Sequence, residues 1–167
     1  AWGTALGKVL ADKGNQVALW AHRPQLAEHI QSDHVNDRYL PGVKLPPTLR
    51  ATGDLEGALR GAELVVMVVP SHALRGVVRE ARRYIPEEAL LCSASKGIEN
   101  ESLMLVSEML LDELGPEVEP RLTYLSGPSF AKEVAAEMPT IVTVAAASGE
   151  VADFVQHAFV TPMFRVY

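Results

Sequence analysis

The stretch E-L-V-V-M-V-V-P, from Glu63 to Pro70, carries the strongest indication of the fold. It is a continuous apolar run, rich in valine, that a proline brings to an end. A run without polar alternation is typical of a strand buried on both faces, as in a parallel sheet whose two sides are covered by helices. We therefore expect a buried parallel strand at Glu63–Val69.

Helical and extended patterns alternate on both sides of this strand. This alternation predicts an α/β fold: a doubly wound, mainly parallel sheet with helices on both faces. The segment Tyr39–Pro47, with three prolines and one glycine, is expected to be a surface loop. Further strands are predicted at Gln16–Trp20, Ala89–Ser93, Leu122–Leu125, Thr140–Ala145 and Phe164–Tyr167, and helices at Thr4–Lys13, Gln25–Ser32, Asp54–Arg60, His72–Tyr84, Asn100–Leu114 (with Leu103, Val106, Leu110 and Leu114 on the core face), Pro128–Met138 and Glu150–Ala158.

Composition narrows the classes of function. With 167 residues, of which 48% are apolar and 22% charged, the chain is expected to form one globular domain. Its formal charge of −6 disfavours nucleic acid and anionic membranes as partners, and no apolar run is long enough to span a membrane. The single cysteine, Cys92, cannot form an internal disulfide, which fits a cytoplasmic setting. No pair of histidines or cysteines has metal-ligand spacing, so we expect no metal.

Strand-to-helix turns are the candidate sites, because ligands of open α/β sheets bind beyond the carboxyl ends of the strands. The first such turn is A-W-G-T-A-L, from Ala1 to Leu6. Gly3 is interpreted as the last glycine of a dinucleotide-binding G-x-G-x-x-G turn, whose following helix offers free amides to a pyrophosphate. The alternative is an ordinary helix start.

The second turn follows Trp20 and reads A-H-R-P. An NAD-preferring site usually carries an acidic residue there, to bind the ribose hydroxyls. Here the acid is missing, and the planar guanidinium of Arg23 suits a 2′-phosphate. NADPH is therefore slightly favoured, NAD stays open, and a solvent-exposed arginine is the alternative.

The third turn is S-G-P-S-F-A-K-E, from Ser126 to Glu133. Gly127 is predicted to cap a helix that begins at Pro128, leaving the amides of Ser129, Phe130 and Ala131 without intrahelical partners. Lys96 ends another strand, and its loop is expected at the same edge of the sheet. Together these groups predict an electropositive pocket for a phosphorylated substrate, whereas a well-formed helix start and an exposed loop lysine are the alternatives.

Six motifs occur in an order that resembles a known family: W-G-T-A-L at Trp2–Leu6, L-W-A-H-R at Leu19–Arg23, Y-L-P-G-V at Tyr39–Val43, V-V-P-S-H at Val68–His72, S-K-G-I-E at Ser95–Glu99 and S-G-P-S-F-A-K-E at Ser126–Glu133. The chain closely resembles the N-terminal, nucleotide-binding domain of bacterial NAD(P)-dependent glycerol-3-phosphate dehydrogenase. The resemblance implies a Rossmann-like dinucleotide-binding domain over residues 1–167.

It also implies hydride transfer between a nicotinamide cofactor and dihydroxyacetone phosphate, giving glycerol 3-phosphate for phospholipid synthesis. The lysine of S-K-G-I-E is then an anchor that stabilises the negative charge developing on the substrate oxygen. By the resemblance, the cofactor contacts are Ala1, Trp2, Gly3, His22, Arg23, Tyr39, Lys96 and Ala131, and the substrate contacts are Lys96, Gly127 and Ser129.

The departures from the family concern both ends. The opening strand and the first two glycines of the family are absent, and so is the helical second domain that follows F-R-V-Y in the family. That domain supplies the proton-donating lysine, so we expect no catalytic residue in this chain, an inactive isolated chain, and a homodimer formed through the missing domain. Two alternatives stay open: a related two-domain dehydrogenase, of the 6-phosphogluconate or ketopantoate type, and a non-catalytic nucleotide-binding module.

Overall fold

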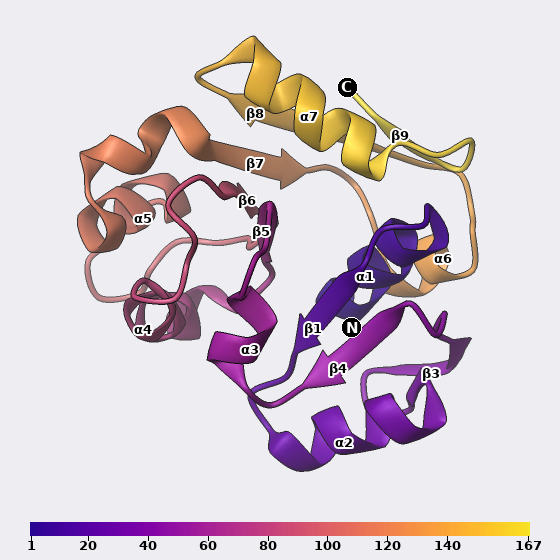
Figure 1. Cartoon of the computed structure of the whole chain (residues 1–167). Helices are drawn as coiled ribbons and strands as arrows, with labels where there is room; N and C mark the ends of the chain where they lie inside the picture. Colours follow the sequence, from indigo (N-terminus) through magenta and orange to yellow (C-terminus); the bar gives the residue numbers. More distant parts are fainter. The chain divides into compact units, whose positions relative to one another are not determined.

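The computed structural model describes all residues from Ala1 to Tyr167, and the chain divides into two compact units. The first unit comprises Ala1–Ala58, Gly127–Thr143 and Gln156–Tyr167, and the second comprises Leu59–Ser126 and Val144–Val155. Figure 1 labels most of the elements of both units. The chain thus enters each unit more than once, so segments far apart in sequence share a core.

The N-terminal part of the first unit is a helix-covered parallel pair of strands. β1 (Val17–Trp20) pairs in parallel with β4 (Leu49–Thr52), Val17 lying opposite Leu49. α1 (Trp2–Asp12) packs on this pair, and α2 (Pro24–Asp33) packs on β4. The sequence pattern missed β4, although buried Leu49 and Ala51 alternate with exposed Arg50 as a half-buried strand requires.

A small hairpin joins α2 to β4, and here the prediction of a surface loop at Tyr39–Pro47 is wrong. β2 (Val35–Asn36) and β3 (Leu40–Lys44) pair antiparallel, Val35 opposite Lys44 and Asn36 opposite Leu40. The register shifts between the two paired positions. Pro41 and Gly42 lie in the irregular stretch, so the proline's missing amide removes no ladder hydrogen bond.

Later segments of the chain complete the first unit. α6 (Ala131–Ala135) packs against α1, and β8 (Thr140–Ala146) pairs in parallel with β9 (Phe164–Val166). α7 (Gly149–Phe159) connects β8 to β9 along the chain, and only its C-terminal part, from Gln156, belongs to this unit, where the buried Phe159 lies against Phe164 with 6.3 Å between ring centroids. The prediction of a helix beginning at Pro128 is wrong, because α6 begins three residues later and has only five residues.

The second unit, which follows α3 (Leu55–Leu59), is a parallel three-strand arrangement. β5 (Leu64–Met67), β6 (Leu90–Ser93) and β7 (Leu122–Ser126) pair in that order, all in parallel. α4 (Ser71–Ala81) and α5 (Val106–Leu114) pack against each other, and the short 3-10 helix η1 (Pro116–Arg121) leads from α5 into β7. The core comprises Met67, Leu74, Val78, Leu91, Met109, Leu110, Val118 and Leu122.

Two sequence predictions fail in this unit. The run at Glu63–Val69 is indeed a strand, but Val65 and Val66 are only half-buried, since within its unit β5 pairs with β6 alone. The helix predicted from Asn100 begins only at Val106. Leu103, predicted to face the core, is 74% exposed and has a φ of 57°, a conformation that no helix residue adopts.

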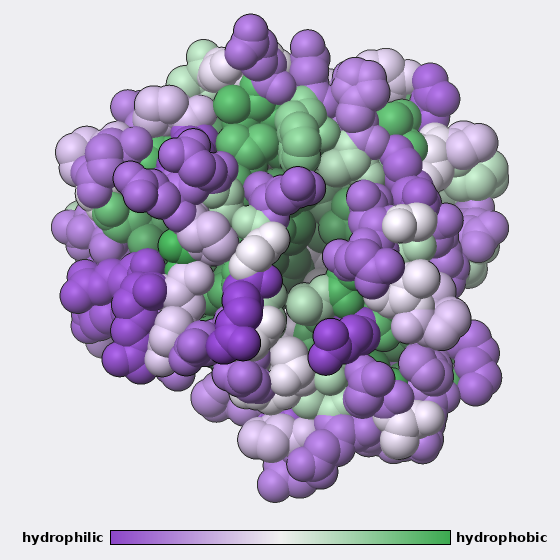
Figure 2. Space-filling model, viewed as in Figure 1, coloured by the Kyte–Doolittle hydropathy of each residue, from purple (hydrophilic) through white to green (hydrophobic).

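The α/β class with mainly parallel strands is confirmed. Cys92 is buried, and burial raises the pKa of its thiol to about 11, so it behaves as a core residue and not as a nucleophile. None of the helices is both long enough and apolar enough to pass through a bilayer. The visible face in Figure 2 mixes hydrophilic and hydrophobic residues.

Candidate functional site

All predicted site residues except Lys96 lie in the first unit, and Lys96 lies in the second. Within the first unit they occupy the start of α1, the turns before α2 and β3, and the segment from Gly127 to the first residue of α6. In that order they are Ala1, Trp2 and Gly3; His22, Arg23 and Tyr39; and Gly127, Ser129 and Ala131.

The start of α1 is rich in hydrogen-bond donors. Its first intrahelical bond runs from the amide of Ala5 to the carbonyl of Ala1, at 3.0 Å, so the amides that precede Ala5 have no partner within the helix. The first turn contains no acidic residue and has no side-chain cap. The indole Nε1 of Trp2 is also buried and donates to no atom of the protein. Unpaired amides at the positive end of a helix favour an anionic acceptor.

The turn after β1 presents a cation and an aromatic pair. The Trp20 indole donates to the carbonyl of Gly53 at 3.2 Å, and its ring meets that of His22 edge to face, with centroids 5.9 Å apart. Arg23 is exposed and is the N-cap residue of α2, whose first turn has Pro24 and no acid. Arg23 thus stands at the start of a second helix whose own first turn carries no acidic side chain.

A buried amide ties the Tyr39 turn to α1. Asn36 is 3% exposed and donates through Nδ2 to the hydroxyl of Thr4 at 2.8 Å. Its Oδ1 and its carbonyl both accept from the amide of Tyr39, at 3.3 and 3.2 Å. Tyr39 itself is 44% exposed, with Arg38 over its ring. Sequence analysis missed Asn36 and Thr4, because a buried polar pair leaves no mark on hydrophobic periodicity.

The Gly127–Ser129 segment has a structural explanation that the sequence did not reveal. A Cβ atom at Gly127 would lie 2.9 Å from both the carbonyl oxygen of Ile141 and the Cα of Val142. Only glycine lets β8 approach this closely. The hydroxyl of Ser129 donates to the carbonyl of Gly127 at 3.3 Å. α6 begins at Ala131, and its first intrahelical bond runs from the amide of Val134 to the carbonyl of Phe130, at 3.0 Å, so the amides from Ala131 to Glu133 have no partner within the helix.

Lys96 is exposed on a loop that leaves β6 and is anchored on both sides. Before it, the Ser95 hydroxyl accepts from the amide of Val69 at 3.0 Å and donates to the carbonyl of Met67 at 3.3 Å. After it, Gly97 has a φ of 111°, which is open to glycine and strained for other residues. Lys96 therefore protrudes from a backbone with a defined path.

An ionic network follows the same loop, and sequence analysis missed it. Arg75 on α4 binds both carboxylate oxygens of Glu99, through Nε and Nη2, each at 2.8 Å. Its Nη1 also binds Asp112 at 2.5 Å and Glu113 at 2.8 Å, and Glu113 accepts from Arg79. Arg75 holds the pKa of Glu99 at about 2, and Arg79 and Arg75 do the same for Glu113. The network joins α4, the Lys96 loop and α5.

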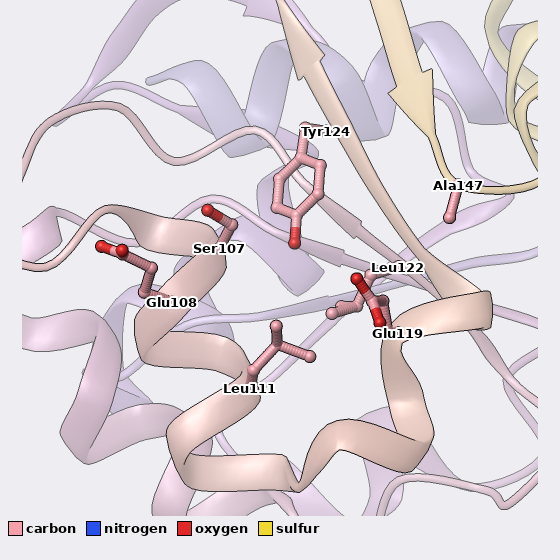
Figure 3. Close-up of a pocket in the computed structure, with 7 residues that line it drawn as sticks. All are labelled: Ser107, Glu108, Leu111, Glu119, Leu122, Tyr124 and Ala147. Atoms are coloured by element: carbon pink, nitrogen blue, oxygen red, sulfur yellow. The ribbon is translucent and has the colours of Figure 1, made fainter.

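A separate cavity of about 250 Å³ lies in the second unit. Figure 3 shows the hydroxyl of Tyr124 and the carboxylate of Glu119 facing the same space. Burial, and then the charge of Glu119, raise the pKa of Tyr124. No predicted site residue lines this cavity, whose walls are Ser107, Glu108, Leu111, Glu119, Leu122, Tyr124 and Ala147.

Comparisons with known proteins point to one family. The protein-family model described as "NAD-dependent glycerol-3-phosphate dehydrogenase N-terminus" matches residues 1–152 of this chain. A "Glycerol-3-phosphate dehydrogenase [NAD(P)+]" of Anaeromyxobacter sp. (strain K) is 50% identical over 99% of this chain and 50% of its own length. The protein of the same name from Bacillus velezensis is 44% identical over 99% of this chain and 48% of its own. The chain spans about half the length of these curated relatives.

Solved structures show the same likeness. The crystal structure of glycerol-3-phosphate dehydrogenase from Coxiella burnetii matches 99% of this chain and 50% of that chain, with a TM-score of 0.91 and 36% identity. The glycerol-3-phosphate dehydrogenase structure from Saccharomyces cerevisiae matches 99% of this chain and 53% of its own, with a TM-score of 0.83 and 28% identity. A GDP-mannose dehydrogenase, at 12% identity and a TM-score of 0.75, shares the fold.

Proposed function

Because the chain belongs to the family of the N-terminal domain of NAD-dependent glycerol-3-phosphate dehydrogenase, we propose that it is the cofactor-binding part of such an enzyme. The enzyme interconverts dihydroxyacetone phosphate and sn-glycerol 3-phosphate for phospholipid synthesis. NAD or NADP, when bound, accepts or supplies the hydride. The observation that carries the proposal is the start of α1, where unpaired amides and the buried indole donor of Trp2 suit an anionic dinucleotide.

Eight residues are assigned as cofactor contacts. Ala1, Trp2 and Gly3 offer main-chain and indole donors, and the exposed guanidinium of Arg23 favours the 2′-phosphate of NADPH. The absence of carboxylates from the first turns of α1 and α2 supports this, because acids there would repel phosphate. His22, Tyr39, Ala131 and Lys96 complete the proposed set.

Substrate contacts are assigned to Lys96, Gly127 and Ser129. The ammonium group of Lys96 stabilises the negative charge that develops on the substrate oxygen as hydride arrives at its carbon. This chain contributes no proton donor in the proposal: a lysine of a helical domain, expected after residue 167, supplies that proton. The isolated chain is therefore inactive or nearly so. The whole enzyme is cytoplasmic and dimerises through that second domain.

The test is turnover by the full-length protein that contains this sequence. We expect oxidation of NADPH, and more slowly of NADH, with dihydroxyacetone phosphate as the acceptor. Ketopantoate and the oxidation of 6-phosphogluconate with NADP serve as comparison reactions and should give no turnover. Turnover with one of these in place of dihydroxyacetone phosphate would mean a related dehydrogenase, and tight NADPH binding without any turnover would mean a non-catalytic module.

A further inference from the structure

We propose that Glu99, held by Arg75, is a positioning residue that fixes the loop carrying Lys96 and so places its ammonium group against the substrate. The inference rests on the proposed function, which assigns Lys96 to the substrate. Glu99 touches neither ligand in this proposal and acts through the backbone of the loop. The carboxylate and the lysine are three residues apart in S-K-G-I-E.

Helix α4 determines the path of the loop after Lys96. Ser71 and Arg75 are one helical turn apart on α4 and so share a face. A Cβ atom at Gly97 would lie 3.0 Å from the hydroxyl oxygen of Ser71, and Arg75 binds Glu99 with two hydrogen bonds. α4 therefore contacts the loop directly after Lys96 and again two residues later.

Glu99 is also fixed through its own backbone and through its neighbours. Its amide donates to the carbonyl of Met104 at 3.0 Å, and its carbonyl accepts from the amide of Leu103 at 2.9 Å. The hydroxyl of Ser102 donates to its Oε2 at 2.5 Å. The side chain is only 18% exposed, and both of its carboxylate oxygens are used. A residue held at this many points is a fixed end for the loop.

The opposite end of the loop is fixed by Ser95, through the carbonyl of Met67 and the amide of Val69. Lys96 thus lies between an anchor on β5 and an anchor on α4. Loosening one anchor leaves the core of the unit intact but lets the lysine backbone drift. A displacement of about 1 Å at a reacting group can cost on the order of 100-fold in rate.

The experiment compares variants of the full-length enzyme. Glu99→Gln keeps the shape of the side chain and removes the charge that Arg75 binds, and we expect it to lower kcat with dihydroxyacetone phosphate about 10- to 100-fold. The dissociation constant of NADPH, followed by its fluorescence, should change by less than about twofold. Glu101→Gln is the matched control: the same substitution in the same loop, at an exposed residue, should leave both constants unchanged.

A double variant tests whether Glu99 acts through Lys96. If it does, Lys96→Ala with Glu99→Gln is no slower than Lys96→Ala alone, because a misplaced lysine costs nothing once the lysine is gone. If the two effects multiply, Glu99 acts independently and the inference is wrong. It is also wrong if Glu99→Gln lowers turnover, NADPH affinity and melting temperature together. If Glu99→Gln does not fold, Arg75→Lys, which keeps the charge but loses the two-bond contact, replaces it.

The inference and the proposed function fail in different ways. A wild-type enzyme without activity on dihydroxyacetone phosphate overturns both. A wild-type enzyme with activity, together with a dead Lys96→Ala variant and a fully active Glu99→Gln variant, overturns only the positioning role of Glu99.

Discussion

The loop that carries Lys96 and the turn that carries Tyr39 each hold an exposed side chain in place, but by different interactions. The Lys96 loop is held by the Arg75–Glu99 ion pair, whose side chains are 22% and 18% exposed. The Tyr39 turn is held by the neutral pair of Asn36 and Thr4, which are 3% and 4% exposed. The ion pair is found where water still reaches the side chains, and the neutral hydrogen bond where it does not. This fits the higher free-energy cost of burying an ion than of burying an amide.

This difference decides how each region should respond to substitution. Arg75 has three carboxylate partners, so losing one of them leaves it paired and the fold intact. The contact between Asn36 and Thr4 has no second partner of this kind. Removing the Asn36 side chain leaves the buried hydroxyl of Thr4 without its donor. Damage to the Lys96 loop should therefore appear mainly in activity, and damage to the Tyr39 turn mainly in stability.

The largest expected effect is on turnover, from Lys96→Ala in the full-length enzyme. Removing one group that stabilises developing negative charge typically costs about 100- to 1000-fold in kcat, so we expect a loss of that order with dihydroxyacetone phosphate. Lys44→Ala removes another exposed lysine, one on β3, and should keep wild-type turnover. If Lys96→Ala and Lys44→Ala showed equal kinetics, Lys96 would not be a substrate contact.

The next effect is on stability, from Asn36→Ala. An unpaired buried polar group costs about 1–3 kcal/mol, so the free energy of unfolding should fall by that amount in urea titrations. Replacing both partners, as Asn36→Leu with Thr4→Val, should restore much of the loss, because no unpaired polar atom then remains. A double variant as unstable as Asn36→Ala would show that the hydrogen bond is not what stabilises the turn.

The same contrast explains what the sequence could predict. Long apolar runs and turn residues located β5, β6 and α4, because hydrophobic periodicity reports on burial. It could not locate β2 and β3, whose pairing is short and irregular and contains Pro41. It placed Leu103 in the core because the spacing fits a helix, but the turn around Glu99 delays the start of α5.

The candidate site divides in the same way. Gly3 and Arg23 are predictions from turn chemistry, which is local in sequence. The contacts that hold the site, Asn36 to Thr4 and Arg75 to Glu99, join residues 32 and 24 positions apart. Local pattern contains no information on such pairs. The motif S-K-G-I-E did contain Glu99, but nothing in the motif showed which arginine binds it.

A smaller effect is expected from Arg23→Gln. This variant tests whether Arg23, which unlike Arg75 is not part of an ionic network, makes the protein prefer NADPH to NADH. Loss of one charge-assisted contact to the 2′-phosphate should weaken NADPH binding about tenfold and leave NADH binding nearly unchanged. Arg50→Gln, at an exposed arginine on β4, is the control and should alter neither affinity. Equal losses for both cofactors would mean that Arg23 does not contact the 2′-phosphate.

The smallest effect concerns acid stability, which should separate the ionic region from the neutral one. Arg79 and Arg75 hold the pKa of Glu113 at about 2, below its ordinary value of 4.5. A carboxylate with a lowered pKa in the folded state stabilises the protein above its unfolded-state pKa. That contribution is lost as the pH falls from about 4.5 to about 2.

The melting temperature of Glu113→Gln should therefore lie below that of wild type at neutral pH, by about 2–4 °C, and the two melting temperatures should converge in acid. Asn36→Ala carries no titrating group, so its difference from wild type should stay constant over the same range. Circular dichroism melts at a series of pH values measure both differences, and a constant gap for Glu113→Gln would contradict the ionic origin of its stabilisation.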